Sequence, residues 1–347
     1  VAAAAALLFD AAPRRTRAIP VGVALAVLVG MYGYGAQRLS AAEETSDGPL
    51  IRIVQANIDQ KEKWRPENLP QVFSDYVRLT TTPTAQRPQA IVWPEGALPA
   101  VFNNLVAPES PYAQGLVDAL QPGQVLLMGA NAATVRADGE ADYFNSLVAL
   151  ERDDRGVAYG ARYDKHTLVP FGEYLPLGEL ATKLGIRSLV HMPEDFTAGP
   201  PPEPLSLAGL PPVQPLICYE ALFPGVTSAA ARRAGKRPGW ILNVSNDAWF
   251  GVTSGPLQHL NLASYRAIEE GLPMIRSTPT GVSAAIDAYG RTLQEKRLGL
   301  GRAGIIDVRL PKALEPTPFS RYGDMGFVVM LTVSVVAAGL ARTRKPR

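Results

Sequence analysis

The sequence contains few of the residues that bind metals or form disulfides. Among 347 residues there are three histidines and one cysteine, Cys218. A single cysteine excludes a disulfide within the chain, and the absence of a His/Cys cluster argues against a zinc site. Charged residues make up only 19% and the net charge is +2, without a basic stripe of the kind that binds nucleic acid. We therefore expect no zinc site and no nucleic-acid partner.

Two apolar runs without charge flank the middle of the chain. Residues 18–36 form a run close to the roughly 20 residues that cross a bilayer, and basic residues at 14–17 precede it. A secretory signal peptide is the competing interpretation, but no clear cleavage site follows. Residues 325–341 form the second run, and a basic cluster at 342–347 favours a membrane anchor over a buried core helix. The positive-inside rule then puts both ends in the cytoplasm and residues 40–320 on the other side.

These runs predict three parts: an N-terminal membrane segment (1–40, with its helix at about 18–36), a globular domain (48–315) and a C-terminal transmembrane helix (325–341). Within the domain, apolar periodicity predicts helices at 66–80, 112–120 and 258–270. It predicts strands at 50–56, 90–93, 124–129, 144–152, 157–163, 213–217, 240–244, 273–277, 282–287 and 303–308. Alternating strands and helices indicate the α/β class with a large mixed sheet.

The lone cysteine stands where a nucleophile would. Residues 213–217 read as a short buried strand, and the chain turns out of it at Cys218. This places the thiol at the carboxyl edge of a sheet, where open α/β sheets build their sites. A lone cysteine is more often a buried, inert small side chain, so this position alone does not establish a role.

Two further polar residues follow predicted strands. Glu95 comes after the strand at 90–93, and Lys165 follows the strand at 157–163. Taken singly, Glu95 reads as a carboxylate at a helix start and Lys165 as a solvated loop residue. Taken with Cys218, they supply what acyl transfer through a thiol requires: a base for the thiol proton and a cation for the developing oxyanion.

Three motifs carry a resemblance to a known family. VWPEGALP around Glu95, YDKHTLVPFGEYLP around Lys165 and ICYEALFP around Cys218 resemble the Glu-Lys-Cys pattern of the nitrilase, or carbon–nitrogen hydrolase, superfamily. With NVSNDAWFG at 243–251 and the flanking spans, the chain more narrowly resembles the apolipoprotein N-acyltransferases of bacterial inner membranes. The resemblance implies a four-layer αββα nitrilase-like sandwich, flanked by transmembrane helices, on the periplasmic side of the membrane.

The resemblance also implies a reaction and its partners. Cys218 would take an acyl chain from a phospholipid, typically phosphatidylethanolamine, as a thioester. The acyl group would then pass to the N-terminal amine of a diacylglyceryl-cysteine on an apolipoprotein. This chemistry would require no metal and no dissociable cofactor. Glu95 would act as general base and acid, while Lys165 and the backbone N–H of Tyr219 would stabilise the oxyanion.

Supporting roles follow from the same resemblance. Glu173 would hold Lys165 in place and charged, although an exposed loop carboxylate is the alternative. Glu220 matches a position implicated in the acyltransferase site, against an ordinary carboxylate at a helix start. Tyr219 and Trp249 would line the acyl or head-group pocket unless they belong to the core. Asn246 and Asp247 would shape their loop or only form its turn, and His259 is expected to be structural because the base of this superfamily is a glutamate.

Other readings remain open. The family carries several more N-terminal membrane helices, so the chain is expected to be an N-terminally truncated form. The main rival is a membrane-tethered amidase that hydrolyses its thioester; an apolar loop within residues 180–196 facing the membrane would favour acyl transfer. A non-catalytic scaffold is disfavoured by the joint presence of Glu95, Lys165 and Cys218.

Overall fold

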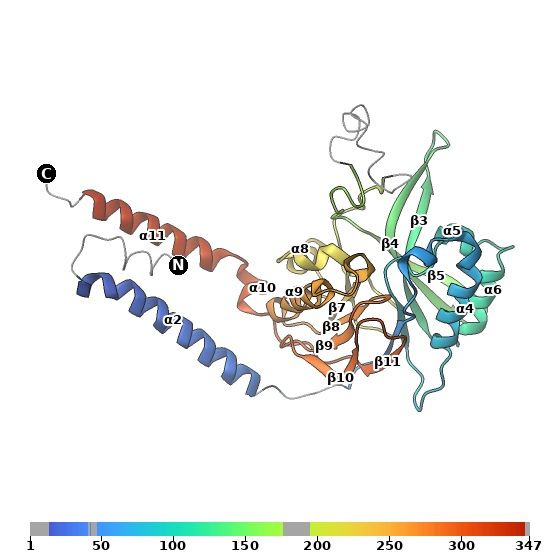
Figure 1. The fold of residues 1–347 in the computed structure, drawn as a ribbon, viewed down its shortest axis with the longest axis horizontal. Coiled ribbons are helices and arrows are strands. Elements are labelled where there is room, and N and C mark those ends of the chain that lie inside the picture. The colour runs from blue at the N-terminus through green and yellow to red at the C-terminus, as the bar shows by residue number, and fades with distance from the viewer. Residues whose placement is uncertain (1–13, 41, 43–46, 176–194, 344–347) are drawn as a thin grey trace. The chain divides into compact units, whose positions relative to one another are not determined.

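The computed structural model describes residues 14–40, 42, 47–175 and 195–343 (Figure 1). The apolar loop expected within 180–196 lies, up to residue 194, outside the described residues. The chain divides into two units, residues 1–45 and 46–347, which are considered separately.

The described part of the first unit contains one long helix, α2 (Arg14–Ser40), and its segment Ala18–Ser40 is long and apolar enough to cross a membrane. Among the described residues it is the one helix that meets both criteria. In the second unit, α11 (Met325–Thr343) has a shorter apolar part, Met325–Val336, whose large side chains are exposed.

The second unit contains two mixed sheets. The larger has the order β11 (Gly304–Arg309), β1 (Leu50–Gln55), β2 (Ala90–Trp93), β3 (Val125–Val135), β4 (Ala141–Asp153) and β5 (Gly156–Asp164). Strands β1, β2 and β3 run parallel, and the remaining pairs are antiparallel.

The smaller sheet has the order β10 (Thr292–Leu298), β9 (Ser283–Ile286), β8 (Met274–Ser277), β7 (Trp240–Val244) and β6 (Val213–Ile217). Here β6, β7 and β8 run parallel. The expectation of one large sheet, drawn from periodicity, was wrong, because apolar periodicity marks strands without giving their partners. The nitrilase-like sandwich that the resemblance implied has two sheets, as found here. Strand β10, which lacks a clear apolar pattern, was not expected.

Side chains that alternate along the strands build three apolar layers. Ile53, Val92, Leu127 and Val244 belong to the core between the sheets. Ile91 and Trp93 point the other way, into a second core. Helices α4 (Leu69–Thr80), α5 (Phe102–Leu105) and α6 (Pro111–Ala119) provide the far side of that core. On the smaller sheet, α9 (Gly255–Glu270) and the start of α8 (Val226–Ala234) close a third core (Figure 1). The result is an α/β sandwich.

The predicted helices at 66–80, 112–120 and 258–270 are confirmed with shifted starts. A 3-10 turn, η1 (Pro66–Asn68), precedes α4, while α6 and α9 begin at Pro111 and Gly255. Each helix carries a proline in its first turn, where the missing N–H would have had no partner within the helix. Short helices α3 (Gln60–Lys63) and α10 (Pro318–Tyr322) were not expected.

Candidate active site

The candidate nucleophile sits on a constrained turn. Strand β6 is fully buried and ends at Ile217, and Cys218 opens the 3-10 turn η3 (Cys218–Leu222). Cys218 has a φ of +49°, in the left-handed region that few residues other than glycine adopt. Such a conformation costs on the order of 1–3 kcal/mol and persists only where the surroundings hold it. The thiol is half-buried at the end of the strand, as the sequence predicted.

Glu220 holds this turn against the segment that carries Lys165. One oxygen of its carboxylate accepts a hydrogen bond from the Ile217 N–H at 2.8 Å. The other accepts from Tyr163 Oη at 2.7 Å and from the N–H groups of His166 and Thr167 at 2.8 and 3.0 Å. Burial raises the pKa of the Glu220 carboxyl and the donated hydrogen bonds lower it, with a net rise. Glu220 is thus a clamp between two parts of the site.

Glu95 lies just beyond β2, where its backbone packs against β3. A Cβ at Gly129 would stand 2.5 Å from Glu95 Cα, so the close approach requires glycine. The carboxylate accepts hydrogen bonds from Asn145 Nδ2 at 2.6 Å and from the Asn246 N–H at 2.5 Å. It is 8% exposed, and its Oε1 lies 3.7 Å from Lys165 Nζ. The base expected from the sequence is therefore buried next to the expected cation.

Lys165 and Glu173 form a buried ion pair. Lys165 Nζ donates to Glu173 Oε1 at 2.8 Å, and the other oxygen of Glu173 accepts from the Val169 N–H at 2.8 Å. Burial alone would lower the pKa of Lys165, but the carboxylates of Glu95 and Glu173, and Cys218 when it is a thiolate, raise it above its ordinary value. The ammonium therefore stays charged, and Glu173 is part of the cluster rather than an exposed loop carboxylate.

The thiol of Cys218 requires a base at neutral pH. Burial and the nearby Glu95 raise its pKa to about 12, against the opposing effects of Lys165 and a hydrogen bond with the Ser245 side chain. A thiol with this pKa is almost entirely protonated near neutral pH, and the thiolate is the nucleophilic form. Glu95 can accept the thiol proton, and the positive charge of Lys165 favours the thiolate.

Tyr219 and Trp249 are in different surroundings from the buried cluster. Tyr219 is half-buried and packs edge-to-face on Phe223, with ring centroids 4.9 Å apart. Trp249 lies on the 3-10 turn η4 (Asp247–Phe250) with 73% of its surface exposed, next to exposed Phe250 and Val252. Trp249 is therefore not a core residue, and of the two alternatives given above only a role in lining the acyl or head-group pocket is left.

The sequence analysis missed two polar residues of the cluster. Asn145 on β4 donates from Nδ2 to Glu95 at 2.6 Å and to Glu173 at 2.8 Å, so it joins the two carboxylates. Lys63 is buried and donates to the Gly96 carbonyl at 2.6 Å; burial lowers its pKa to about 8, while the charge of Glu95 acts in the opposite direction. The polar pair Asn145-Ser146 directly before the apolar run 147–150 of β4 was an available signal for Asn145.

Within the described residues, no group of three or more His, Cys, Asp or Glu side chains is arranged to hold a metal ion. What the cluster offers is a thiol, a carboxylate and an ammonium in a largely buried setting, the requirements of nucleophilic acyl chemistry.

Comparison with known proteins assigns the chain to a family. Residues 50–318 match the carbon-nitrogen hydrolase family. The apolipoprotein N-acyltransferase of Caulobacter vibrioides is 48% identical over 93% of this chain and 60% of its own length. That of Bradyrhizobium diazoefficiens is 38% identical over 99% of this chain and 63% of its own length. The chain thus spans about 60% of the length of the curated relatives it matches.

A solved structure agrees on the fold. An amidase from Nesterenkonia sp. superposes with a TM-score of 0.50 at 19% identity, over 78% of this chain and 94% of that chain. A mutant of that amidase carries the acetamide moiety of fluoroacetamide covalently on its active-site cysteine. The chain therefore belongs to the carbon-nitrogen hydrolase family and is a homologue of the apolipoprotein N-acyltransferases.

Proposed function

We propose that this protein transfers an acyl chain from a phospholipid, through a thioester on Cys218, to the N-terminal amine of diacylglyceryl-cysteine on apolipoproteins. The observation that carries the proposal is 48% identity to an apolipoprotein N-acyltransferase along 93% of the chain. The grouping of Glu95, Lys165 and Glu173 beside Cys218 supports it, because these side chains supply each step of the reaction.

In the first half-reaction, Glu95 takes the proton of the Cys218 thiol and the sulfur attacks the ester carbonyl of the phospholipid. The C–S bond forms and the carbonyl oxygen becomes an oxyanion, which Lys165 and the backbone N–H of Tyr219 stabilise. Collapse breaks the C–O bond. The leaving oxygen takes the proton from Glu95, which gives a lysophospholipid and the S-acyl protein.

In the second half-reaction, the amine of the diacylglyceryl-cysteine attacks the thioester carbonyl. Glu95 accepts a proton from the amine, the same oxyanion position is used again, and the C–S bond breaks. The amide leaves as product, and Cys218 regains its proton from Glu95. Glu173 and Asn145 keep Lys165 and Glu95 in place through both steps, since each contacts the cluster directly.

The membrane setting supports a lipid donor. We propose that residues 1–40 and 325–341 contribute transmembrane helices that flank a catalytic domain at 48–315, on the extracytoplasmic side of the bacterial inner membrane. The apolar helix Ala18–Ser40 and the exposed apolar side chains of Met325–Val336 are consistent with this arrangement. Exposed Trp249 on η4 and half-buried Tyr219 are the candidates to contact the acyl chain or head group.

The test is the intact mass of the detergent-solubilised protein after incubation with phosphatidylethanolamine. We expect a gain of one acyl group in the parent and none in Cys218→Ala. A diacylglyceryl-cysteinyl peptide should then discharge the acyl group and appear as an N-acyl amide. An adduct that water discharges while the peptide gains nothing would identify a hydrolase instead. Failure to form an adduct, in protein whose Cys218 still reacts with iodoacetamide, would also contradict the proposal.

A further inference from the structure

The three residues that follow β7 contact both reacting groups of the site. Strands β6 and β7 run parallel with Ile217 opposite Val244, so the next residues, Cys218 and Ser245, are neighbours. The fully buried Ser245 hydroxyl acts on the neighbouring thiol and lowers the pKa of Cys218. The N–H of the following residue, Asn246, donates to Glu95 at 2.5 Å. A single short segment thus contacts the nucleophile and the base.

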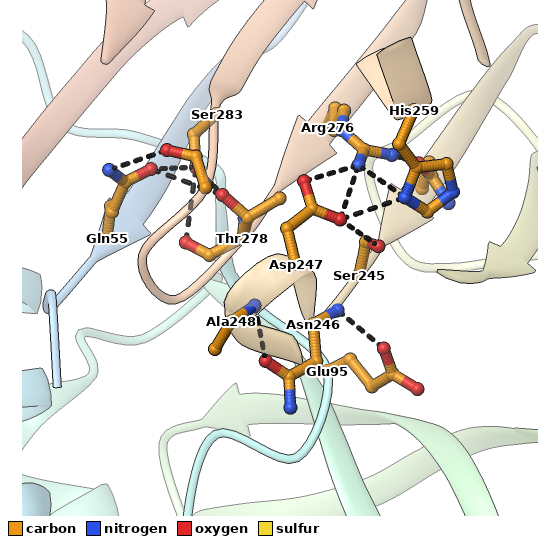
Figure 2. Close-up of polar contacts among 12 residues, drawn as sticks. Gln55, Glu95, Ser245, Asn246, Asp247, Ala248, His259, Arg276, Thr278 and Ser283 are labelled. Carbon is orange, nitrogen blue, oxygen red and sulfur yellow. Dashed lines mark hydrogen bonds and ion pairs between the residues drawn. The ribbon is translucent and has the colours of Figure 1, made fainter. Parts of the chain in front are cut away.

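The carboxylate of Asp247, the third residue of this segment, connects it to Arg276 and His259 (Figure 2). Ser245 Oγ donates to Asp247 Oδ1 at 3.0 Å. Arg276 Nη2 lies 2.9 and 2.8 Å from the two oxygens of Asp247, and His259 Nδ1 lies 2.9 Å from Oδ1. Asp247 and Arg276 are 1% and 0% exposed, so the ion pair is shielded from water. A Cβ at Gly281 would stand 2.6 Å from Asp247 Cβ, which shows how closely the next loop packs on it.

Arg276 and His259 determine the ionisation state of Asp247. Burial would raise the pKa of Asp247, but Arg276 and His259 lower it to about 2, so the carboxylate is ionised. Arg276 also donates from Nη1 to the side-chain oxygen of Asn243 on β7. Within the part of the chain that the structure describes, His259 Nε2 has no hydrogen-bond partner. Asp247 is therefore a fixed negative charge, held from β8 by Arg276 and from α9 by His259.

Ser245 has a single hydroxyl proton and two neighbours that can accept it. While Cys218 is a thiol, the hydroxyl donates to Asp247 and its oxygen can accept the S–H. When Cys218 becomes a thiolate, the hydroxyl can turn and donate to sulfur, because Asp247 keeps Arg276 and His259 as partners. Asp247 competes with the thiolate for that proton and also repels the thiolate through its charge.

We propose that Asp247 is a positioning residue: with Arg276 and His259 as its anchor, it aligns Cys218 and Glu95 through Ser245 and Asn246. This rests on the proposed function only in that it takes Cys218 as the nucleophile and Glu95 as the base. The arrangement makes opposite predictions for two neighbours. Removing the Ser245 hydroxyl should make the thiolate harder to form, whereas removing the Asp247 charge should make it easier.

The single cysteine allows a direct test on the full chain. Iodoacetamide modification followed by intact mass reports on Cys218 alone, and its rate against pH follows the thiolate fraction. For Ser245→Ala we expect a rate about ten-fold lower at a given pH, since a hydrogen bond to a charged group is lost. For Asp247→Asn we expect the rate to rise by about three-fold or more, because a nearby negative charge is removed.

Ser283→Ala is the matched control. Ser283 is also fully buried in the smaller sheet, but its hydroxyl donates to Gln55 at 2.6 Å, in a separate polar group (Figure 2). We expect its alkylation profile to stay within about two-fold of the parent, since no charge or hydrogen bond at the thiol changes. Thermal melts establish that each variant is folded at the assay temperature.

If Asp247→Asn does not fold, Arg276→Gln takes its place. That change leaves the Asp247 carboxylate without its countercharge, so alkylation should slow, whereas Arg276→Lys, which keeps the charge, should lie nearer the parent. The proposal would be overturned if Ser245→Ala and Asp247→Asn changed the alkylation rate of Cys218 in the same direction. It would also be overturned if neither variant changed that rate more than Ser283→Ala does. Because the assay needs no acyl donor, its outcome is independent of whether the protein transfers acyl chains.

Discussion

The clamp made by Glu220 provides the sharpest stability prediction. All of its partners are donors: the Ile217 N–H on one oxygen, and Tyr163 Oη with the N–H groups of His166 and Thr167 on the other. Glutamine in its place can keep an oxygen toward three of these donors, but its NH₂ group then faces the Ile217 N–H. Glu220→Gln therefore leaves one buried donor without a partner at the turn that carries Cys218.

The magnitude follows from these contacts. The unpaired N–H costs about 1–3 kcal/mol, and each of the other hydrogen bonds loses about 1 kcal/mol when its acceptor is no longer charged. The total is about 4–6 kcal/mol. For a domain of the size matched by the family, residues 50–318, this lowers the Tm by about 7–10 °C.

The assay is a thermal melt of the purified protein, with Glu270→Gln as the control. Glu270 is buried to the same 2% exposure, but within the described residues its side chain accepts one hydrogen bond, from the Ser228 N–H at 3.2 Å. That bond can be kept by the glutamine oxygen, so we expect the Tm of Glu270→Gln to change by less than about 3 °C. If Glu220→Gln melts no lower than Glu270→Gln, Glu220 does not act as the clamp described above.

Three further predictions concern charged side chains. Lys165→Met should raise the thiol pKa and slow alkylation of Cys218 by about ten-fold or more, because the cation that favours the thiolate is lost; an unchanged rate would contradict this. Asp247, with its pKa lowered to about 2, should contribute about 2 kcal/mol of stability that is present above pH 3.8 and lost as the pH falls toward 2. Melts between pH 5 and 2 should show this loss in the parent and not in Asp247→Asn. Lys63, with its pKa lowered to about 8, makes the unfolded chain bind more protons between pH 8 and 10.5, so stability should rise by up to about 3 kcal/mol across that range. Lys63→Met should lack this rise, and an equal rise would show that another group is responsible.

The local patterns in the sequence located the strand ends of the site. The strands at 90–93, 213–217 and 240–244 have the predicted bounds, and each is completely buried. Sites in open α/β sheets form at the carboxyl ends of the strands. The predicted end of the strand at 213–217 was therefore enough to place Cys218 at that edge. Motifs around Glu95, Lys165 and Cys218 then indicated the family, which the comparison with known proteins confirmed.

The partners of buried polar groups could not be inferred in the same way. Glu220 resembled a carboxylate at a helix start, yet its hydrogen bonds come mainly from residues 53–57 positions away. Lys63 and Asn145 lie in segments that read as a loop and an ordinary strand, and their roles depend on where Gly96, Glu95 and Glu173 fall in space. Local sequence can mark a polar residue inside a strand, as at Asn145-Ser146, but it does not identify the partner of that residue.

By itself the sequence determined the α/β class, most element bounds, the single thiol and the family. These follow from apolar periodicity and short motifs, which depend on neighbours along the chain. Only the tertiary structure decided which strands pair in each sheet, that Asn145 joins two carboxylates and that Arg276 neutralises Asp247 from a neighbouring strand. A buried polar side chain is stable only with a partner, and here the partners come from distant segments that folding brings together.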